Sequence, residues 1–191
     1  ATSPDGPSLE TIINEHYNPI IIALRESKKV VIAGVNGVAA GAGANIALAC
    51  DIIVASRSAS FIQAFSKIGL IPDSGGTFFL PRLIGFQRAA ALMMTGDSIT
   101  AEEAFNMGMI YKCYDDDQFI SSLDKLALKI AQMPTKALEF TKKALQDSLY
   151  SNLEQQLSTE LKYQQLSGET KDFKEGIKAF IEKRKPNFIG E

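Results

Sequence analysis

The pattern of hydrophobic and polar positions changes along the chain. Between Lys29 and about Leu70, two short runs rich in Val and Ile, 30–35 and 51–56, flank a stretch of small apolar residues at 42–50. Short β-branched runs are typical of strands, and a longer stretch of Ala and Leu is typical of a helix. The alternation therefore predicts α/β layering in the first part of the chain.

A helical period dominates after about Gly75. Apolar residues recur at helical spacing, and Gly, Ser, Thr, Asp and Pro stand where helices would start or stop. The predicted helices cover 8–27, with a kink at Pro19, and then 86–96, 99–108, 118–133, 135–150 and 152–168, with one short strand at 109–114. We expect a core region at 1–120 followed by a helical region at 121–191.

Composition indicates a globular protein. The 191 residues are 46% hydrophobic and 22% charged, which is enough to bury a sizeable core. No apolar run reaches the length of about 18 residues that a membrane span needs. A net charge of −2 without a basic cluster does not favour nucleic-acid binding. Two cysteines and a start without signal-peptide features indicate a cytoplasmic protein.

Two familiar chemistries are disfavoured by residues that the chain lacks. His16 is the only histidine, so a histidine-based triad or a multi-histidine metal site is not available, and we expect no metal. The run from Gly41 to Ile46 has some glycines of a dinucleotide-binding fingerprint, but Ile46 stands where the third glycine belongs. We therefore expect no dinucleotide cofactor.

Gly41, Ala42 and Gly43 stand between a predicted strand and the start of a predicted helix. The first N–H groups of a helix have no partner within it, and they lie at the positive end of the helix dipole. Such a place stabilises an oxyanion, for example a carbonyl oxygen that becomes negative as an enolate forms. Close packing of a helix on a sheet is the alternative explanation for these small residues.

A series of ordered motifs resembles the signatures of the crotonase (enoyl-CoA hydratase/isomerase) superfamily. The motifs are VIAGVNGVAAGAGANIALACDIIVAS, ASFIQAFSKIGLIPDSGGTFFLPRLIG, TGDSITAEEAFNMGMIYKCY and KEGIKAFIEKRKPNF. The resemblance runs from about Ser8 to the C-terminus and implies a crotonase-like ββα spiral with a helical C-terminal trimerisation region. It also implies an acyl-CoA thioester substrate, with coenzyme A as part of the substrate, and a homotrimer or hexamer.

One departure from the superfamily lies near the start of the chain. The family begins with further strands that carry the first oxyanion donor and much of the coenzyme A site, and nothing before Ser8 matches that motif. The resemblance places the second donor in Gly41, Ala42 and Gly43, with the N–H of Ala42 as the expected group. The resemblance therefore implies that the chain by itself supplies half of the oxyanion hole, and it leaves the activity of an isolated fragment open.

Carboxylates separate the reactions within the superfamily. Hydratases resemble this chain but carry glutamates at the positions of Asn45 and Phe65. An amide and a phenyl ring cannot deprotonate a water, so the resemblance disfavours hydration. Asn45 and Phe65 are then expected to contact the substrate without taking part in proton transfer.

Asp73 matches the position where several isomerases of the superfamily keep a single Asp or Glu. Leu70, Ile71 and Phe79 are its apolar neighbours in the sequence. We expect these neighbours to desolvate the Asp73 carboxylate, so that it can both take and return a proton. Without the resemblance, Asp73 would be interpreted as the N-cap of the helix that follows.

The resemblance implies an acyl-CoA isomerase. The motifs are most similar to those of isomerases that act on ring-1,2-epoxyphenylacetyl-CoA in phenylacetate breakdown, and the same mechanism would shift a 3-enoyl-CoA of fatty acid metabolism. Phe180 and Lys183 match positions that contact the adenine and phosphates of coenzyme A, although a solvated amphipathic helix explains both equally well. An enoyl-CoA hydratase and a non-catalytic binding module remain the alternatives.

Overall fold

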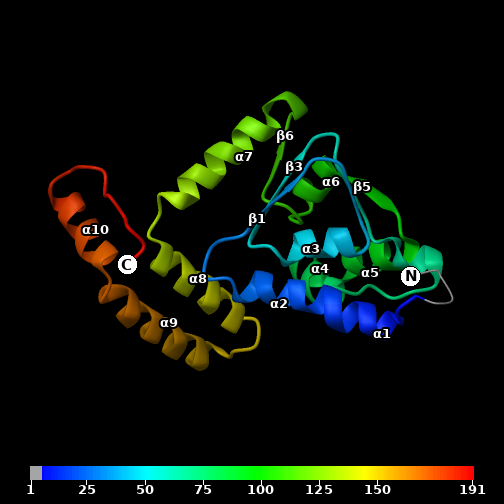
Figure 1. Ribbon diagram of the computed structural model, residues 1–191, viewed down its shortest axis with the longest axis horizontal. Helices are drawn as coiled ribbons and strands as arrows, with labels where there is room; N and C mark the ends of the chain where they lie inside the picture. The colour runs from blue at the N-terminus through cyan, green and yellow to red at the C-terminus, as the bar shows by residue number, and fades with distance from the viewer. Residues whose placement is uncertain (1–5) are drawn as a thin grey trace. The chain divides into compact units, whose positions relative to one another are not determined.

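The computed structural model describes residues 6–191, and the chain separates into two compact units (Figure 1). Unit 1 comprises residues 6–26 and 31–123, and unit 2 comprises residues 27–30 and 124–191. The segment 27–30 belongs with the helical unit, although the sequence analysis assigned it to the core region. Within the described residues, no helix is long and apolar enough to cross a membrane.

The strands of unit 1 form two small sheets, with the orders β1-β3-β6 and β2-β4-β5. Every neighbouring pair is parallel except β4 and β5, which are antiparallel. The strands are β1 (Ile32–Val35), β2 (Val38–Ala40), β3 (Ile52–Ser56), β4 (Ser60–Ile62), β5 (Ser98–Thr100) and β6 (Lys112–Tyr114).

From β1 to β4 the chain visits the two sheets alternately, and β5 and β6 then join the second and the first sheet. β1 and β2 are followed by α3 (Ala42–Ala49), and then β3 and β4 each add a strand beside their predecessors. Ile32 lies opposite Ile52 in the first sheet, and Val38 lies opposite Ser60 in the second. This repeat of two strands and a helix is the ββα spiral that the family resemblance predicts, and Figure 1 labels β1, α3 and β3 of it.

Helices complete unit 1. The first predicted helix contains a widened π-helical turn, in which the Asn18 N–H donates to the carbonyl of Ile13. The sequence predicts a kink at Pro19. The irregular part of this segment is instead the π-helical turn, which lies just before the proline. The elements are α1 (Leu9–Thr11), η1 (Ile12–Tyr17), α2 (Asn18–Glu26), the 3₁₀ segment η2 (Ala64–Ile68), α4 (Gly76–Ile84), α5 (Phe86–Thr95) and α6 (Ala101–Asn106).

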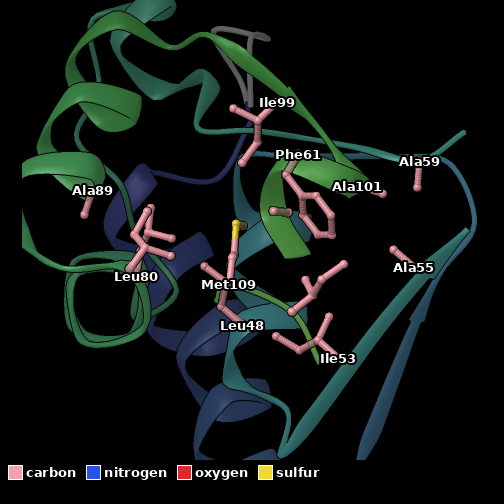
Figure 2. Close-up of a cluster of buried hydrophobic side chains, with 13 residues drawn as sticks. Leu48, Ile53, Ala55, Ala59, Phe61, Leu80, Ala89, Ile99, Ala101 and Met109 are labelled. Carbon is pink, nitrogen blue, oxygen red and sulfur yellow. The ribbon is translucent and has the colours of Figure 1, made fainter. Parts of the chain in front are cut away.

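The hydrophobic core of unit 1 joins segments that are far apart in the sequence (Figure 2). Phe61 of β4 and Leu80 of α4 are among its largest fully buried side chains, at 2% and 0% exposure. Leu48, Ile99 and Met109 pack into the same cluster from α3, from β5 and from the loop after α6. Burial of these side chains therefore fixes α3 and α4, the two helices that carry the predicted site, in one core.

Unit 2 contains the long helices. α7 (Asp116–Ala131) begins in unit 1 and continues into unit 2, which also holds α8 (Thr135–Asp147), α9 (Leu153–Gly168) and α10 (Lys171–Ile181). α8 and α9 pack on each other, and the rings of Phe140 and Tyr163 stack with their centroids 5.5 Å apart.

The C-terminal segment of unit 2 folds back onto α10. The Asp172 carboxylate accepts hydrogen bonds from the N–H groups of Ile189 and Gly190, at 2.7 and 2.9 Å. Arg184 forms a two-pronged ion pair with Glu175, at 2.6 and 2.9 Å. The hydrogen bond from Arg184 lowers the pKa of Glu175 to about 2.

Candidate functional site

Gly41 turns the chain from β2 into α3. Its φ of +54° lies in the region that favours glycine. Its N–H donates to the carbonyl of Ile62 at 2.8 Å, and its carbonyl accepts the N–H of Asn45 at 3.1 Å. The sequence predicts Gly41 among the oxyanion donors, but its N–H is already bonded to Ile62, so Gly41 shapes the turn and does not act as a donor.

Ala42 and Gly43 provide the candidate oxyanion donors. Both N–H groups precede the first helical bond of α3, and among the described residues neither has an acceptor. Gly43 is exposed, and a Cβ built on it would have no described atom within 4 Å. The start of α3 therefore presents two N–H groups without acceptors among the described residues, with open space beside Gly43, at the positive end of an eight-residue helix.

The loop before α4 has an unusual backbone. Ser74 and Gly75 both have left-handed φ values, of 50° and 75°. The Gly76 N–H donates to the carbonyl of Asp73 at 2.9 Å and closes this turn. α4 is capped by Gly75 without a side-chain hydrogen bond. The interpretation of Asp73 as a helix N-cap is therefore wrong.

Asp73 is half-buried, and Ser74 Oγ donates to its carboxylate at 2.9 Å. Leu70 and Ile71 are 38% and 82% exposed, so they do not enclose the carboxylate as the sequence analysis expected. The ring of Phe79 instead packs against Gly75, where a Cβ would collide with it. Within unit 1, the carboxylate is thus positioned by its loop and by Ser74 rather than by an apolar pocket.

Asn45 joins the two halves of the site. It lies on α3 one turn after Ala42, and its side chain has 0% exposure. Its Nδ2 donates to the main-chain carbonyl of Asp73 at 2.8 Å, and its Oδ1 accepts from Gln63 Nε2 at 2.8 Å. The structure thus brings Asn45, the start of α3 and the Asp73 loop together. The family resemblance predicts that Asn45 contacts the substrate, whereas in the structure its fully buried amide contacts protein groups.

Gln63 is a site residue that the sequence analysis missed. It is 3% exposed and bonds to Asn45, although it follows a strand of mostly apolar residues. A polar side chain two residues after Phe61 and two before Phe65, both of which are buried, was the available signal. Its role depends on a partner 18 positions earlier, which single-sequence patterns do not reveal.

Phe65 packs at the same turn. It is 6% exposed on η2, and a Cβ on Gly41 would lie 3.6 Å from its Cζ. Phe65 therefore forms an apolar support beneath the entrance to α3. Its position against the site is clear, while contact with a substrate stays a prediction.

Phe180 and Lys183 belong to unit 2, whereas the other predicted site residues belong to unit 1. Phe180 is 86% exposed on α10, and Lys183 follows the helix with a φ of 54°. Their contact with coenzyme A stays a prediction. Across residues 6–191, no three His, Cys, Asp or Glu side chains gather as a metal site would require.

Comparisons with known proteins agree with this architecture. The family profile described as "Enoyl-CoA hydratase/isomerase" matches residues 3–191. The 1,2-epoxyphenylacetyl-CoA isomerase of Escherichia coli is 44% identical over 98% of this chain and 72% of that protein. A probable enoyl-CoA hydratase of Rhodobacter capsulatus is also 44% identical, over 97% of this chain and 72% of that protein.

Solved structures extend the likeness to the backbone. An enoyl-CoA hydratase from Bacillus anthracis superposes with a TM-score of 0.92 at 33% identity, covering 97% of this chain and 73% of that one. An enoyl-CoA hydratase/isomerase from Mycobacterium abscessus superposes with a TM-score of 0.91 at 36% identity, covering 95% and 70%. The sequence, the ββα spiral and these similarities together show that the chain belongs to the enoyl-CoA hydratase/isomerase family.

Proposed function

We propose that the protein is an acyl-CoA isomerase in which Asp73 moves the proton and the start of α3 holds the enolate oxygen. The observation that carries this proposal is the link through Asn45. One buried amide connects the backbone of the carboxylate loop to the helix whose first N–H groups are without acceptors in unit 1. A base and an oxyanion donor on two segments that one amide joins suit proton transfer next to a thioester.

The reaction on a 3-enoyl-CoA follows from these groups. The Asp73 carboxylate removes a proton from C2, and the electron pair moves toward the thioester carbonyl, whose oxygen becomes negative. The N–H of Ala42 or Gly43 donates to that oxygen, and loss of one such donor costs about 3 kcal/mol in other enzymes. The protonated Asp73 then returns the proton at C4, and the double bond moves to C2–C3.

The acyl group is either a 3-enoyl chain or the ring epoxide of phenylacetyl-CoA. The second substrate is supported by the name of the Escherichia coli relative, a 1,2-epoxyphenylacetyl-CoA isomerase. Coenzyme A enters as part of the substrate, with Phe180 and Lys183 proposed to bind its adenine and phosphates. No other cofactor is proposed.

Hydration is disfavoured by the residues at positions 45 and 65. Asn45 is fully buried with its amide bonded to protein groups, and Phe65 offers an apolar ring. Neither can deprotonate a water. Relatives named as hydratases are nevertheless similar to this chain, so the assay must include crotonyl-CoA.

We also propose that the protein acts in the cytoplasm as a homotrimer or hexamer. Leu153, Leu157 and Leu161 recur every four residues along α9 and are 74%, 55% and 62% exposed. Side chains four apart share a helix face, so these leucines form an apolar stripe suited to contact with another subunit.

The test is Asp73→Asn in the full-length natural protein, assayed with a 3-enoyl-CoA and with ring-1,2-epoxyphenylacetyl-CoA. The change preserves shape and removes the proton acceptor, so we expect kcat to fall at least about 100-fold with little change in affinity. Asp97→Asn, at an exposed aspartate of the same unit, is the matched control. Near-native turnover in Asp73→Asn, or wild-type hydration of crotonyl-CoA as fast as isomerisation, would overturn the proposal.

A further inference from the structure

We infer that Gln63 and Asn45 form an amide relay that positions Asp73 through its backbone. The relay runs from Gln63 Nε2 to Asn45 Oδ1 and from Asn45 Nδ2 to the Asp73 carbonyl, with both hydrogen bonds 2.8 Å long. Both residues are positioning residues, because neither side chain reaches open space in unit 1. The catalytic part of this inference rests on the proposed function, whereas the relay itself does not.

The direction of each hydrogen bond in the relay is fixed. A main-chain carbonyl can only accept, so Asn45 must present its NH₂ group to Asp73. Its oxygen then faces Gln63, which must in turn present its own NH₂ group. Flipping either amide would bring two acceptors or two donors together. One carbonyl of the Asp73 loop therefore sets the orientation of both buried amides.

The chain keeps Gln63 buried although burial leaves part of its amide unpaired. Gln63 is 3% exposed, and its Oε1 is buried without a hydrogen-bond donor among the described residues. An unpaired buried acceptor destabilises a fold. An apolar residue at this position would avoid that cost but could not donate to Asn45. The hydrogen bond from Nε2 is therefore the feature that Gln63 contributes.

The relay ends on a strained turn. The Asp73 carbonyl accepts hydrogen bonds from the Asn45 amide and from the Gly76 N–H. Within the turn from Asp73 to Gly76, Ser74 has a φ of 50°. A left-handed φ in a residue other than glycine persists only where its surroundings determine it. Asn45 also fills the space beside Gly76 so closely that a Cβ there would collide with its amide. Loss of the relay should therefore let the loop relax and move the carboxylate.

The sharpest test is Gln63→Glu, followed as a function of pH. An ionised carboxylate would turn an acceptor toward Asn45 Oδ1 and break the relay, whereas a protonated one can donate and restore it. We expect kcat relative to wild type to fall roughly 10- to 100-fold near pH 8 and to recover as pH falls toward about 5. KM should change less than about threefold, because the variant alters positioning and not substrate contact.

Two control variants separate positioning from a general loss of packing. Gln63→Met removes the donor without adding a titratable group, so its relative kcat should be low at every pH. Ser56→Ala removes another buried polar side chain of unit 1, 3% exposed in wild type, and should leave kcat unchanged. A Gln63→Glu deficit that does not depend on pH, or a Ser56→Ala loss of equal size, would overturn the inference.

Amide hydrogen exchange tests the relay without any enzyme assay. The Gly76 N–H donates to the Asp73 carbonyl, so Gln63→Met should speed its exchange about tenfold, with Ser56→Ala unchanged. A wild type without isomerase turnover would overturn the proposed function but not the relay. Unchanged exchange of the Gly76 N–H in Gln63→Met would overturn the relay by itself. If the variants do not fold at neutral pH, Gln63→Glu should refold near pH 5, because a protonated carboxyl can donate to Asn45, and Gln63→Met should not. Refolding of both variants, or of neither, near pH 5 would overturn the inference.

Discussion

The ring of Phe65 lies beside Gly41, where a Cβ would be 3.6 Å from Phe65 Cζ, an ordinary van der Waals distance. Gly41 is also held by its N–H bond to Ile62. The turn at the start of α3 is thus held by two backbone hydrogen bonds of Gly41, to Ile62 and from Asn45, and bordered by one aromatic side chain. The geometry of the N–H donors therefore depends on Phe65, whose side chain has no group that could take part in proton transfer.

Phe65→Ala is expected to destabilise the protein. Removing a ring that is 6% exposed leaves a cavity under the turn, and such changes cost about 3–5 kcal/mol. Phe65→Leu, which keeps most of the volume, should cost less than half as much. Urea denaturation measures both free energies of unfolding, and a loss below about 1 kcal/mol for Phe65→Ala would show that the ring does not support the turn.

Ala42→Val is expected to block the site without unfolding the chain. Ala42 is half-buried at the start of α3, where a branched side chain would crowd a thioester approaching the backbone. Calorimetric titration with an acyl-CoA should show weaker binding, while the urea midpoint changes little. Unchanged affinity and turnover would remove Ala42 from the oxyanion assignment.

Gly76→Ala is expected to damage both stability and turnover. The new Cβ would collide with the Asn45 amide, which is held at both ends and cannot move aside. Overpacking of this kind costs about 1–3 kcal/mol. Gly43→Ala is the matched control for stability, because a Cβ there meets no described atom within 4 Å. Equal unfolding free energies for the two variants would contradict the prediction.

The ion pair of Glu175 and Arg184 is expected to resist acid. The pKa of Glu175 is lowered from 4.5 to about 2, first by the hydrogen bond from Arg184 and then by the N–H of Asn187. A lowered pKa contributes stability that is present above the ordinary value and is lost as pH falls through the lowered one. A ¹³C titration of the Glu175 carboxyl should therefore have its midpoint near 2 in wild type.

Arg184→Gln should move that midpoint up toward 4.5, whereas Lys185→Gln, at the next residue, should leave it in place. The C-terminal segment should also exchange its amide hydrogens faster in Arg184→Gln at neutral pH, because Arg184 and Asn187 share Glu175. A wild-type midpoint near 4.5 would mean that the ion pair does not form in solution.

Leu157→Glu is expected to break the proposed oligomer. Leu157 is the middle residue of the exposed leucine stripe on α9 and is 55% exposed in the single chain. A buried charge at a subunit contact strongly opposes association. Light scattering should give a trimer or hexamer for wild type and smaller species for the variant. Ser158→Glu, at the next exposed position, should associate like wild type.

Much of the fold could be predicted from the sequence where local rules decide the structure. Thr100 and Glu103 form the capping box at the start of α6, and Gly96 ends α5 with a left-handed φ of 67°. The strands at Ile32–Val35 and Ile52–Ser56 also follow from the sequence, because each lies in a run of β-branched residues long enough to indicate a strand. These capping residues and β-branched runs lie within a few residues of the helix ends and strands that they predict.

Other features depend on partners that are distant in the sequence. β2 and β4 have three residues each, and pairing with each other defines them more than any internal pattern does. The alternative N-cap role of Asp73 failed because two left-handed residues separate it from α4. The Asn45 bond to the Asp73 carbonyl spans 28 positions, so no local pattern points to it.

The loop at Asp73 is held by its main-chain carbonyl and not by its carboxylate. Asn45 and Gly76 bind an atom that every amino acid possesses, while the Asp73 side chain bonds to the neighbouring Ser74. A mutation at position 73 can therefore replace the side-chain group while the hydrogen bonds from Asn45 and Gly76 to the main-chain carbonyl remain. The fold of the loop and the chemistry of its side chain are thus separable at position 73, so a single codon change can alter the second while the hydrogen bonds that hold the first stay in place.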